Sequence, residues 1–296
     1  MRLPGDVDAA RLRGLIGLAR EEDMGSLGDV TSQIAGLKGE ATGRIVVRRA
    51  CVVAGMAIAP QVLSAFDPSL VLTAGITDGQ RVERPGTELG RIRGPAATML
   101  SAERTLLNFL QRMSGVATLT WQFVDAVVGT DARIYDTRKT APAWRDLDKY
   151  AVRCGGGHNH RHGLHDAVLL KDNHLAGVPV ERLAEVITEM RKRAAALSPA
   201  PGFFEVEVDT LEQLEQVLRV EGVDVILLDN FTQEQMERAV RRRDALELRG
   251  RVELEASGGI DLATVRSVAE TGIDRIAVGA LTHSAPAADI GLDIAM

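Results

Sequence analysis

The sequence predicts an α/β protein with two parts: a small α+β domain, then a domain of parallel strands and crossover helices. The chain has 296 residues, which at about 150 residues per domain indicates two domains. From residue 132 onward, short β-branched runs alternate with helical segments, a pattern typical of a parallel sheet. Aromatic residues make up only 3% and hydrophobic residues 45%, which suits the aliphatic core of such a sheet.

The first part reads as a mixture of helices and strands. Its expected elements are, in order, a helix over 7–22, a loop at MGSLGDVTS, strands around 43–53 and 70–72, a turn-rich region over 78–94, and a helix over 99–128 that breaks near Ser114–Gly115.

The second part contains six short apolar runs, each followed by a helical or polar segment. The expected strands are RIYDT, AVLLKDN, FFEVEV, DVILLDN, VELEASGG and RIAVGA, and the clearest helices are 180–197, 211–220, 233–248 and 262–270. Six such strands without a long reversal favour a barrel over an open sheet.

Composition and charge exclude several classes of protein. The 35 Lys and Arg against 41 Asp and Glu give a net charge of −6, which argues against a nucleic-acid or anionic-membrane binder. Cys51 and Cys154 lack metal-ligand spacing and are expected to be reduced thiols. The acidic N-terminal stretch does not resemble a signal peptide, and no apolar run approaches the roughly 20 residues that span a bilayer. A soluble, cytoplasmic protein is expected.

Reactive and glycine residues follow every predicted strand. Because the carboxyl ends of parallel barrel strands meet on one face, these residues predict an active site there. In chain order they are Asp136, Thr137, Arg138 and Lys139; Lys171, Asp172 and Asn173; Glu207; Asp229 and Asn230; Ser257, Gly258 and Gly259; and Gly279.

Positive charge gathers in one window of this acidic chain. Between Arg133 and Lys171 there are eight Lys and Arg against four Asp, together with four histidines. Such a window favours a small polyanionic substrate. The segment HNHRHGLH also admits a zinc site, but it lacks a Cys pair, and Arg161 and Lys171 would oppose a cation. Histidine as a hydrogen-bond donor to an anion fits better.

The segment ASGGIDLATV places Ser257, Gly258 and Gly259 between a strand and a helix. Glycine lets backbone N–H groups approach an anion, so a monophosphate site is expected here and near Gly279. Glu207 and Asp229 then face a basic pocket. They could bind sugar hydroxyls, hold Mg²⁺ beside a polyphosphate, or stabilise a cationic transition state.

These motifs resemble those of the quinolinate phosphoribosyltransferase family, also called carboxylating nicotinate-nucleotide pyrophosphorylases, through nearly the whole chain. The matching segments are EEDMGSLGDVTS, SAERTLLNFLQRMSGVAT, DTRKTAPAWRDLDKYAVRCGGGHNHRHGLHDAVLLKDNH, EVEV, ILLDN, LEASGGI and VGALTHS. The resemblance implies a type II phosphoribosyltransferase with an N-terminal α/β sandwich domain over 1–115, an open α/β barrel over 116–284, and a tail over 285–296 that packs back on the first domain. The implied reaction joins quinolinate to 5-phosphoribosyl 1-pyrophosphate with Mg²⁺, giving nicotinate mononucleotide, pyrophosphate and CO₂ in NAD synthesis.

The resemblance also implies a role for each site residue. Arg138, His160 and Arg161 would bind the quinolinate carboxylates, and Arg104 would enter from a neighbouring subunit of a homodimer or higher even oligomer. Lys139, Lys171, Glu207 and Asp229 would be catalytic, the two acids lying near the ribose and the metal. The 5-phosphate would be bound by Ser257, Gly258, Gly259, Gly279 and His283.

Two departures from the family pattern are expected to change loop shape without loss of activity. Ser26 and Leu27 make the loop from Gly25 to Gly28 one residue longer than usual, and Ala141, Ala143 and Trp144 replace the usual Thr, Gly and Leu. A paralogous branch associated with molybdenum-transport operons shares the fold, and a non-catalytic metabolite- or metal-binding protein is the alternative from another class. The anion-binding set at Arg138, His160, Arg161 and Lys171 favours the quinolinate enzyme.

Overall fold

The computed structural model describes residues 4–5 and 7–295, and contacts between residues divide the chain into two compact units. Unit 1 comprises the residues up to Trp121, residues 140–156 and the residues from Leu281 onward. Unit 2 comprises residues 122–139 and 157–280. Segment 140–156, which lies within the second predicted domain, therefore groups with unit 1. The domain boundaries at 115 and 284 stay a prediction.

Unit 2 is built on a six-stranded sheet in which every neighbouring pair is parallel. The strand order is β6-β11-β10-β9-β8-β7, so β6 and β7 are the two edges and the barrel is open. This confirms the open α/β barrel and all six strands expected from the sequence. The strands are β6 (Arg133–Tyr135), β7 (Val168–Leu170), β8 (Phe204–Val208), β9 (Val225–Asp229), β10 (Glu253–Ser257) and β11 (Arg275–Ala277).

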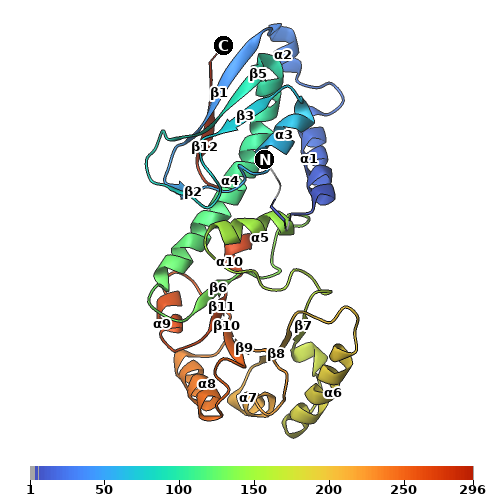
Figure 1. Ribbon diagram of the computed structural model, residues 1–296, viewed down its shortest axis with the longest axis vertical. Helices are drawn as coiled ribbons and strands as arrows, with labels where there is room; N and C mark the ends of the chain where they lie inside the picture. The colour runs from blue at the N-terminus through green and yellow to red at the C-terminus, as the bar shows by residue number, and fades with distance from the viewer. Residues whose placement is uncertain (1–3, 6, 296) are drawn as a thin grey trace. The chain divides into compact units, whose positions relative to one another are not determined.

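Helices cover the outer side of this sheet (Figure 1). Two of them begin at a capping box, in which the Thr210 or Thr232 side chain accepts from the backbone N–H of the glutamine three residues on. Such boxes satisfy donors that a helix start leaves unpaired. The helical segments are η1 (Asp172–His174), η2 (Val180–Arg182), α6 (Leu183–Ala195), α7 (Leu211–Val217), α8 (Gln233–Ala245) and α9 (Val265–Ala269).

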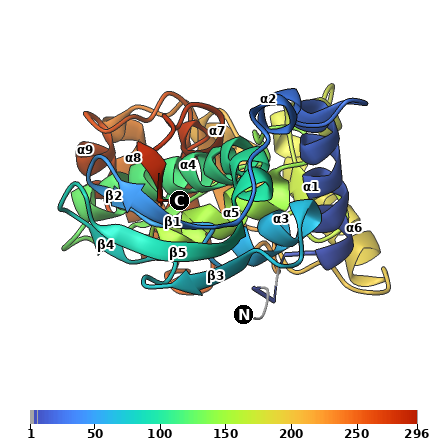
Figure 2. The same cartoon turned by 90° about the horizontal axis from the view of Figure 1, so that it is seen from above.

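Unit 1 contains a four-stranded antiparallel sheet in the order β12-β1-β5-β3. Helix α3 packs against α1 and β3 beside this sheet, which gives the expected α/β sandwich (Figure 2). The C-terminal strand β12 pairs with β1 from Val47–Ile290 to Thr42–Ala295. The elements are α1 (Ala9–Met24), α2 (Val30–Ala35), β1 (Glu40–Val47), β2 (Cys51–Val52), α3 (Ala59–Phe66), β3 (Val71–Ala74), β4 (Arg81–Val82), β5 (Glu88–Pro95), α4 (Ala96–Ala126), α5 (Arg145–Cys154), α10 (Ala280–His283) and β12 (Ile290–Ala295).

The region over 78–94, predicted to be rich in turns, has turns at 78–79 and 85–86, but strand β5 occupies it from Glu88 onward, and there the prediction is wrong. Its glycines are needed for close strand approach. A Cβ on Gly90 would lie 3.0 Å from the Thr73 carbonyl oxygen of β3 and 3.1 Å from Met56. Glycine depletion in ordinary strands made this segment look like a loop.

The break expected near Ser114–Gly115 is also wrong, because α4 runs unbroken from Ala96 to Ala126. Both residues serve packing instead. The Ser114 hydroxyl accepts from the N–H of Ala54 at 3.0 Å and donates to its carbonyl oxygen at 3.1 Å. A Cβ on Gly115 would overlap the carbonyl oxygen of Pro286, so glycine here admits the C-terminal segment.

The unusual residues after DTRKT have visible local effects. Ala143 has a φ of +64°, in the left-handed region that glycine adopts without strain. The next residue, Trp144, stacks on Phe109 with ring centroids 4.8 Å apart. The changed loop is therefore anchored by an aromatic contact.

No helix within the described residues is both long and apolar enough to cross a membrane.

The packing of Gly115 leads to a stability test. We expect Gly115→Ala to lower the free energy of unfolding by about 1–3 kcal/mol, the usual cost of overpacking. The matched control is Gly14→Ala in α1, where a Cβ meets nothing within 4 Å and alanine should stabilise by up to about 1 kcal/mol. Denaturant unfolding of both variants measures the difference; equal stability would contradict the packing role.

Candidate active site

A pocket of about 610 Å³ opens in unit 2. Its lining residues come from the carboxyl ends of the barrel strands and the loops that follow them, where the sequence placed the site. They are Thr137, Arg138, Lys139, His160, Arg161, Leu169, Lys171, Glu207, Leu227, Asp229, Asn230, Glu255, Ser257, Gly258, Gly259 and Ala277.

Strand alternation selects which side chains reach this pocket. On β9 the lining residues are Leu227 and Asp229, and on β10 they are Glu255 and Ser257. The residues between them, such as Leu228 and Ala256, are fully buried on the opposite face, as the period of two requires.

Cationic side chains form one wall of the pocket: Arg138, Lys139, Arg161 and Lys171. Arg161 is 8% exposed, and burial together with the neighbouring charge of Arg138 lowers its pKa. Two guanidinium groups that repel one another in a partly buried place gain from a bound anion. This wall is therefore suited to carboxylate or phosphate groups.

Two carboxylates hold the chain that presents Arg161. Asp136, at the end of β6, accepts hydrogen bonds from the His160 N–H at 2.8 Å and the Asn159 side-chain amide at 2.6 Å. Asp166 accepts from the N–H groups of His162 and Gly163 at 2.6 and 2.7 Å. Although burial opposes its charge, these bonds lower the pKa of Asp166. The loop around Arg161 is thus fixed on both sides.

Two further carboxylates line the pocket, Glu207 and Asp229. Glu207 forms an ion pair with Lys171, and Asp229 accepts from the side-chain amide of Asn230 at 2.8 Å. Both offer hard oxygen ligands of the kind Mg²⁺ prefers. Their place in one pocket therefore fits a magnesium ion bound between protein and polyphosphate.

The loop after β10 supplies backbone to the pocket. Gly258 has a φ of +101° and Gly259 a φ of +59°, and a Cβ on Gly258 would overlap the Asn230 side chain. Asn230 itself has a φ of +54°. Unusual backbone at adjoining loops is typical of binding sites.

The helix expected over 262–270 begins later, at Val265. Asp261 Oδ1 accepts from the N–H groups of Ala263 and Thr264 at 2.9 and 3.0 Å. Because these N–H groups already have an acceptor within the protein, an anion would be bound by the Ser257–Gly259 loop and not by the N-terminus of the helix.

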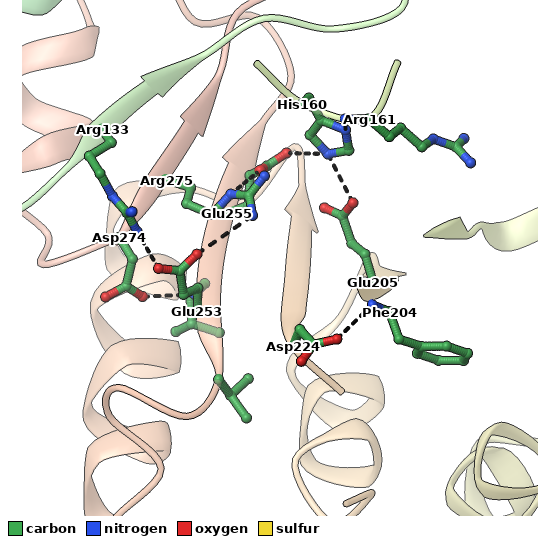
Figure 3. A network of polar contacts seen from close by, with 12 residues as sticks. Arg133, His160, Arg161, Phe204, Glu205, Asp224, Glu253, Glu255, Asp274 and Arg275 are labelled. Atoms are coloured by element: carbon green, nitrogen blue, oxygen red, sulfur yellow. Dashed lines mark hydrogen bonds and ion pairs between the residues drawn. The ribbon is translucent and has the colours of Figure 1, made fainter. Parts of the chain in front are cut away.

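A buried charged cluster adjoins the pocket (Figure 3). It consists of His160, Glu205, Glu255 and Arg275, and both glutamates are 0% exposed. Burial opposes charge on His160, but its contacts with the two glutamates raise its pKa to about 9; burial and the charge of Glu255 raise the pKa of Glu205.

Sequence reasoning missed Glu205 and Glu255 as members of the site region. A signal was present, because a glutamate inside an apolar strand must be paired when buried. In FEVEV, Glu205 shares its face with Glu207, two residues on. The same holds for Glu255 and Ser257 in ELEAS.

Three of the residues to which the family resemblance gives a role do not line this pocket. Gly279 lies two residues after Ala277, beyond the end of β11. Arg104 and His283 belong to unit 1, where Arg104 lines a separate pocket of about 340 Å³ and His283 contacts Ser284. The basic window also divides, because Arg145, Lys149 and Arg153 lie on α5 in unit 1.

The four histidines of HNHRHGLH do not come together. His158 stacks on Tyr135, His162 lies edge-on to His165, and His160 faces the buried glutamates. Within the described part of the chain, His160 with Glu205 and Glu255 is the one group with metal-ligand spacing. Arg275 already lies 2.7 Å from Glu255 and supplies positive charge there. The four histidines therefore do not form one common set of metal ligands.

Comparison with known proteins matches both parts of the chain. Residues 29–114 match the N-terminal domain model of quinolinate phosphoribosyl transferase, and residues 116–293 match its C-terminal domain model. A nicotinate-nucleotide pyrophosphorylase [carboxylating] of Mycobacterium leprae is 46% identical over 293 residues, covering 98% of each chain. A probable enzyme of that name from Bacillus subtilis is 37% identical, covering 93% of this chain and 90% of its own. The structure of the nicotinate-nucleotide pyrophosphorylase from Francisella tularensis superposes with a TM-score of 0.88 at 34% identity, covering 100% of both chains.

The cationic wall leads to a binding test with pyrophosphate alone. At ten times its Kd it should stabilise the chain by about 1.4 kcal/mol, raising Tm by about 2–4 °C. Lys139→Ala should reduce this rise, whereas Lys192→Ala, an exposed change on α6, should preserve it. Thermal unfolding measures the shift; equal reductions in both variants would place the anion elsewhere.

Proposed function

The chain belongs to the quinolinate phosphoribosyltransferase family, and we propose that the family's reaction takes place in the pocket of unit 2. That reaction transfers the phosphoribosyl group of 5-phosphoribosyl 1-pyrophosphate to quinolinate with loss of CO₂. The observation that carries the proposal is a single pocket lined by four cationic side chains, by the carboxylates of Glu207 and Asp229, and by the Ser257–Gly259 loop. This lining matches a dicarboxylate next to a phosphorylated sugar.

Quinolinate is bound through its two carboxylates. Arg138 and Arg161 offer planar forks for them, and Lys139 and Lys171 complete the positive wall. Burial and the neighbouring charge of Arg138 lower the pKa of Arg161, and a bound dianion relieves the repulsion between the two guanidinium groups. A monocarboxylate such as nicotinate neutralises less of this charge and should bind more weakly. His160 directly precedes Arg161 in the chain and lines the same pocket as both arginines.

The phosphorylated sugar lies toward the glycine loop. Ser257, Gly258 and Gly259 bind the 5-phosphate, with Gly279 and His283 as the further residues expected near it. Glu207 and Asp229 hold the ribose and carry Mg²⁺, which supplies positive charge for the departing pyrophosphate. Lys171, paired with Glu207, links the two halves of the pocket.

The chemistry requires positioning and electrostatics rather than a covalent nucleophile. The bond from the anomeric carbon to pyrophosphate breaks, and Glu207 and Asp229 stabilise the resulting oxocarbenium character. The pyridine nitrogen forms the new bond to that carbon. The quaternised ring then accepts the electron pair of the breaking carboxylate bond, CO₂ leaves, and the ring carbon takes a proton from water.

The working assembly is a homodimer or a higher even oligomer in which Arg104 enters a neighbouring subunit's site. Arg104 is exposed on α4 and lines a pocket of unit 1 together with Leu15 and Leu18. Leu18 is 66% exposed, which suits a surface that another subunit covers. We place the reaction in the cytoplasm, where the two free thiols Cys51 and Cys154 remain reduced.

The substrate assignment predicts a specific assay. With quinolinate, 5-phosphoribosyl 1-pyrophosphate and Mg²⁺, the protein should release CO₂ and pyrophosphate in equal amounts, and nicotinate should not replace quinolinate. Arg161→Ala should reduce quinolinate turnover by about 100-fold, the value of a lost charged contact, while circular dichroism stays unchanged. Turnover of nicotinate in place of quinolinate would assign a sister activity. Unchanged turnover in Arg161→Ala would refute the carboxylate site.

Shared sites predict complementation between two inactive chains. An Arg104→Ala chain mixed with a Lys171→Ala chain should regain about a quarter of wild-type activity, because half of the random dimers hold one intact site of two. Subunit exchange is verified with differently tagged chains. Absence of recovery in exchanged dimers would show that Arg104 acts within its own chain or not at all.

A further inference from the structure

Two fully buried glutamates hold one side of the pocket without being its substrate ligands. Glu205 and Glu255 lie on β8 and β10, each two residues before a residue at the pocket. His160 Nε2 lies 2.9 Å from Glu205 Oε2 and 3.4 Å from Glu255 Oε1. Arg275 Nε lies 2.7 Å from the other Glu255 oxygen (Figure 3).

The second nitrogen of His160 is also engaged within the protein. His160 Nδ1 accepts a hydrogen bond from the backbone N–H of Arg161 at 2.7 Å, and this contact leaves Nε2 to face the two glutamates. Both nitrogens of the imidazole thus have protein partners, and its connection to a ligand runs through Arg161. The shape of the pocket at Arg161 depends on how His160 is held.

Burying two carboxylates in the interior of unit 2 costs free energy. Each buried carboxylate loses the hydration that it has in water, and apolar side chains would fill the same volume at a lower cost in free energy. Glu205 has His160 as its partner, whereas Glu255 is shared between His160 and Arg275. The charge pattern therefore serves orientation of the imidazole rather than stability.

We propose that Glu205 and Glu255 are positioning residues for quinolinate: they fix His160, and His160 fixes the backbone that aims Arg161 into the pocket. The inference rests on the proposed function and deepens it. The charged groups around the imidazole come from three strands: Glu205 on β8 and Glu255 on β10 face it, and Arg275 on β11 lies against Glu255. Asp136 accepts from the backbone N–H of His160, and the backbone N–H of Arg161 donates to its ring.

The test compares Glu205→Gln and Glu255→Gln with Glu253→Gln. Glu253 lies on the same strand as Glu255 and pairs with Arg275 and Arg133, but not with His160. We expect the first two changes to raise the KM for quinolinate by about ten-fold, with kcat and the KM for phosphoribosyl pyrophosphate within about two-fold. The Glu253 variant should match the wild type.

The direction in which the KM for quinolinate changes distinguishes a positioning role of the glutamates from a long-range electrostatic effect of their charge. If the glutamates acted only through their negative potential, removing one would strengthen binding of a dianion and lower the KM for quinolinate. A fall in KM, or equal losses in kcat and both KM values, would overturn the proposal. Glu205→Asp, which keeps the charge but shortens the side chain, tests the same point if a glutamine variant fails to fold, and should also raise the KM.

A double-mutant cycle tests the route through Arg161. Calorimetric quinolinate titrations of Glu205→Gln, Arg161→Lys and the double variant should show that the Glu205 effect disappears once Arg161 is replaced. An undiminished effect would mean that Glu205 acts by another route. A stoichiometric metal in the purified wild type that Glu205→Gln loses would assign the cluster to metal binding instead. If the wild type does not turn over quinolinate, the proposed function itself fails. If the wild type is active and the glutamate variants have the same KM for quinolinate as the wild type, only the positioning role fails.

Discussion

Every second side chain of a β-strand points to the same face, and the candidate site depends on this constraint. In unit 2 it directs Glu207, Asp229 and Ser257 into one pocket from three neighbouring strands, while the residues between them pack outward. One step back along β8 and β10, the same alternation places Glu205 and Glu255 beside the pocket. The pocket residues Glu207, Asp229 and Ser257 and the charged residues Glu205 and Glu255 thus form successive layers on the same face of the sheet.

Charge balance is the second organising principle. The chain carries a net charge of −6, yet its pocket brings together Arg138, Lys139, Arg161 and Lys171 against Glu207, Asp229 and Glu255. The acids pair with cations within the protein, as Glu207 does with Lys171 and Glu255 with Arg275. Both arginines line the pocket, where their charges favour a bound anion. A small dianion is therefore attracted to this place in an otherwise acidic molecule.

The sequence was most informative where one physical rule acts locally. The six barrel strands and the residues at their ends follow from hydrophobic pattern and from the convergence of parallel strands, so ten of the expected site residues line one pocket. It was misleading where a residue answers a distant contact. Gly115 suggested a helix break but admits Pro286, and Gly90 suggested a turn but lies in a strand against Thr73. The His160 cluster could not be predicted because its partners come from separate strands, 45 or more residues away along the chain.

The central claim is that this pocket recognises a dicarboxylate by its paired arginines and a phosphate by its glycine loop. An X-ray structure of crystals grown with quinolinate and phosphate tests it most directly. We expect the two carboxylates to lie against Arg138 and Arg161 and a phosphate to lie at Ser257–Gly259, with His160 still facing Glu205. Quinolinate bound outside this pocket, or with its carboxylates turned away from both arginines, would contradict it.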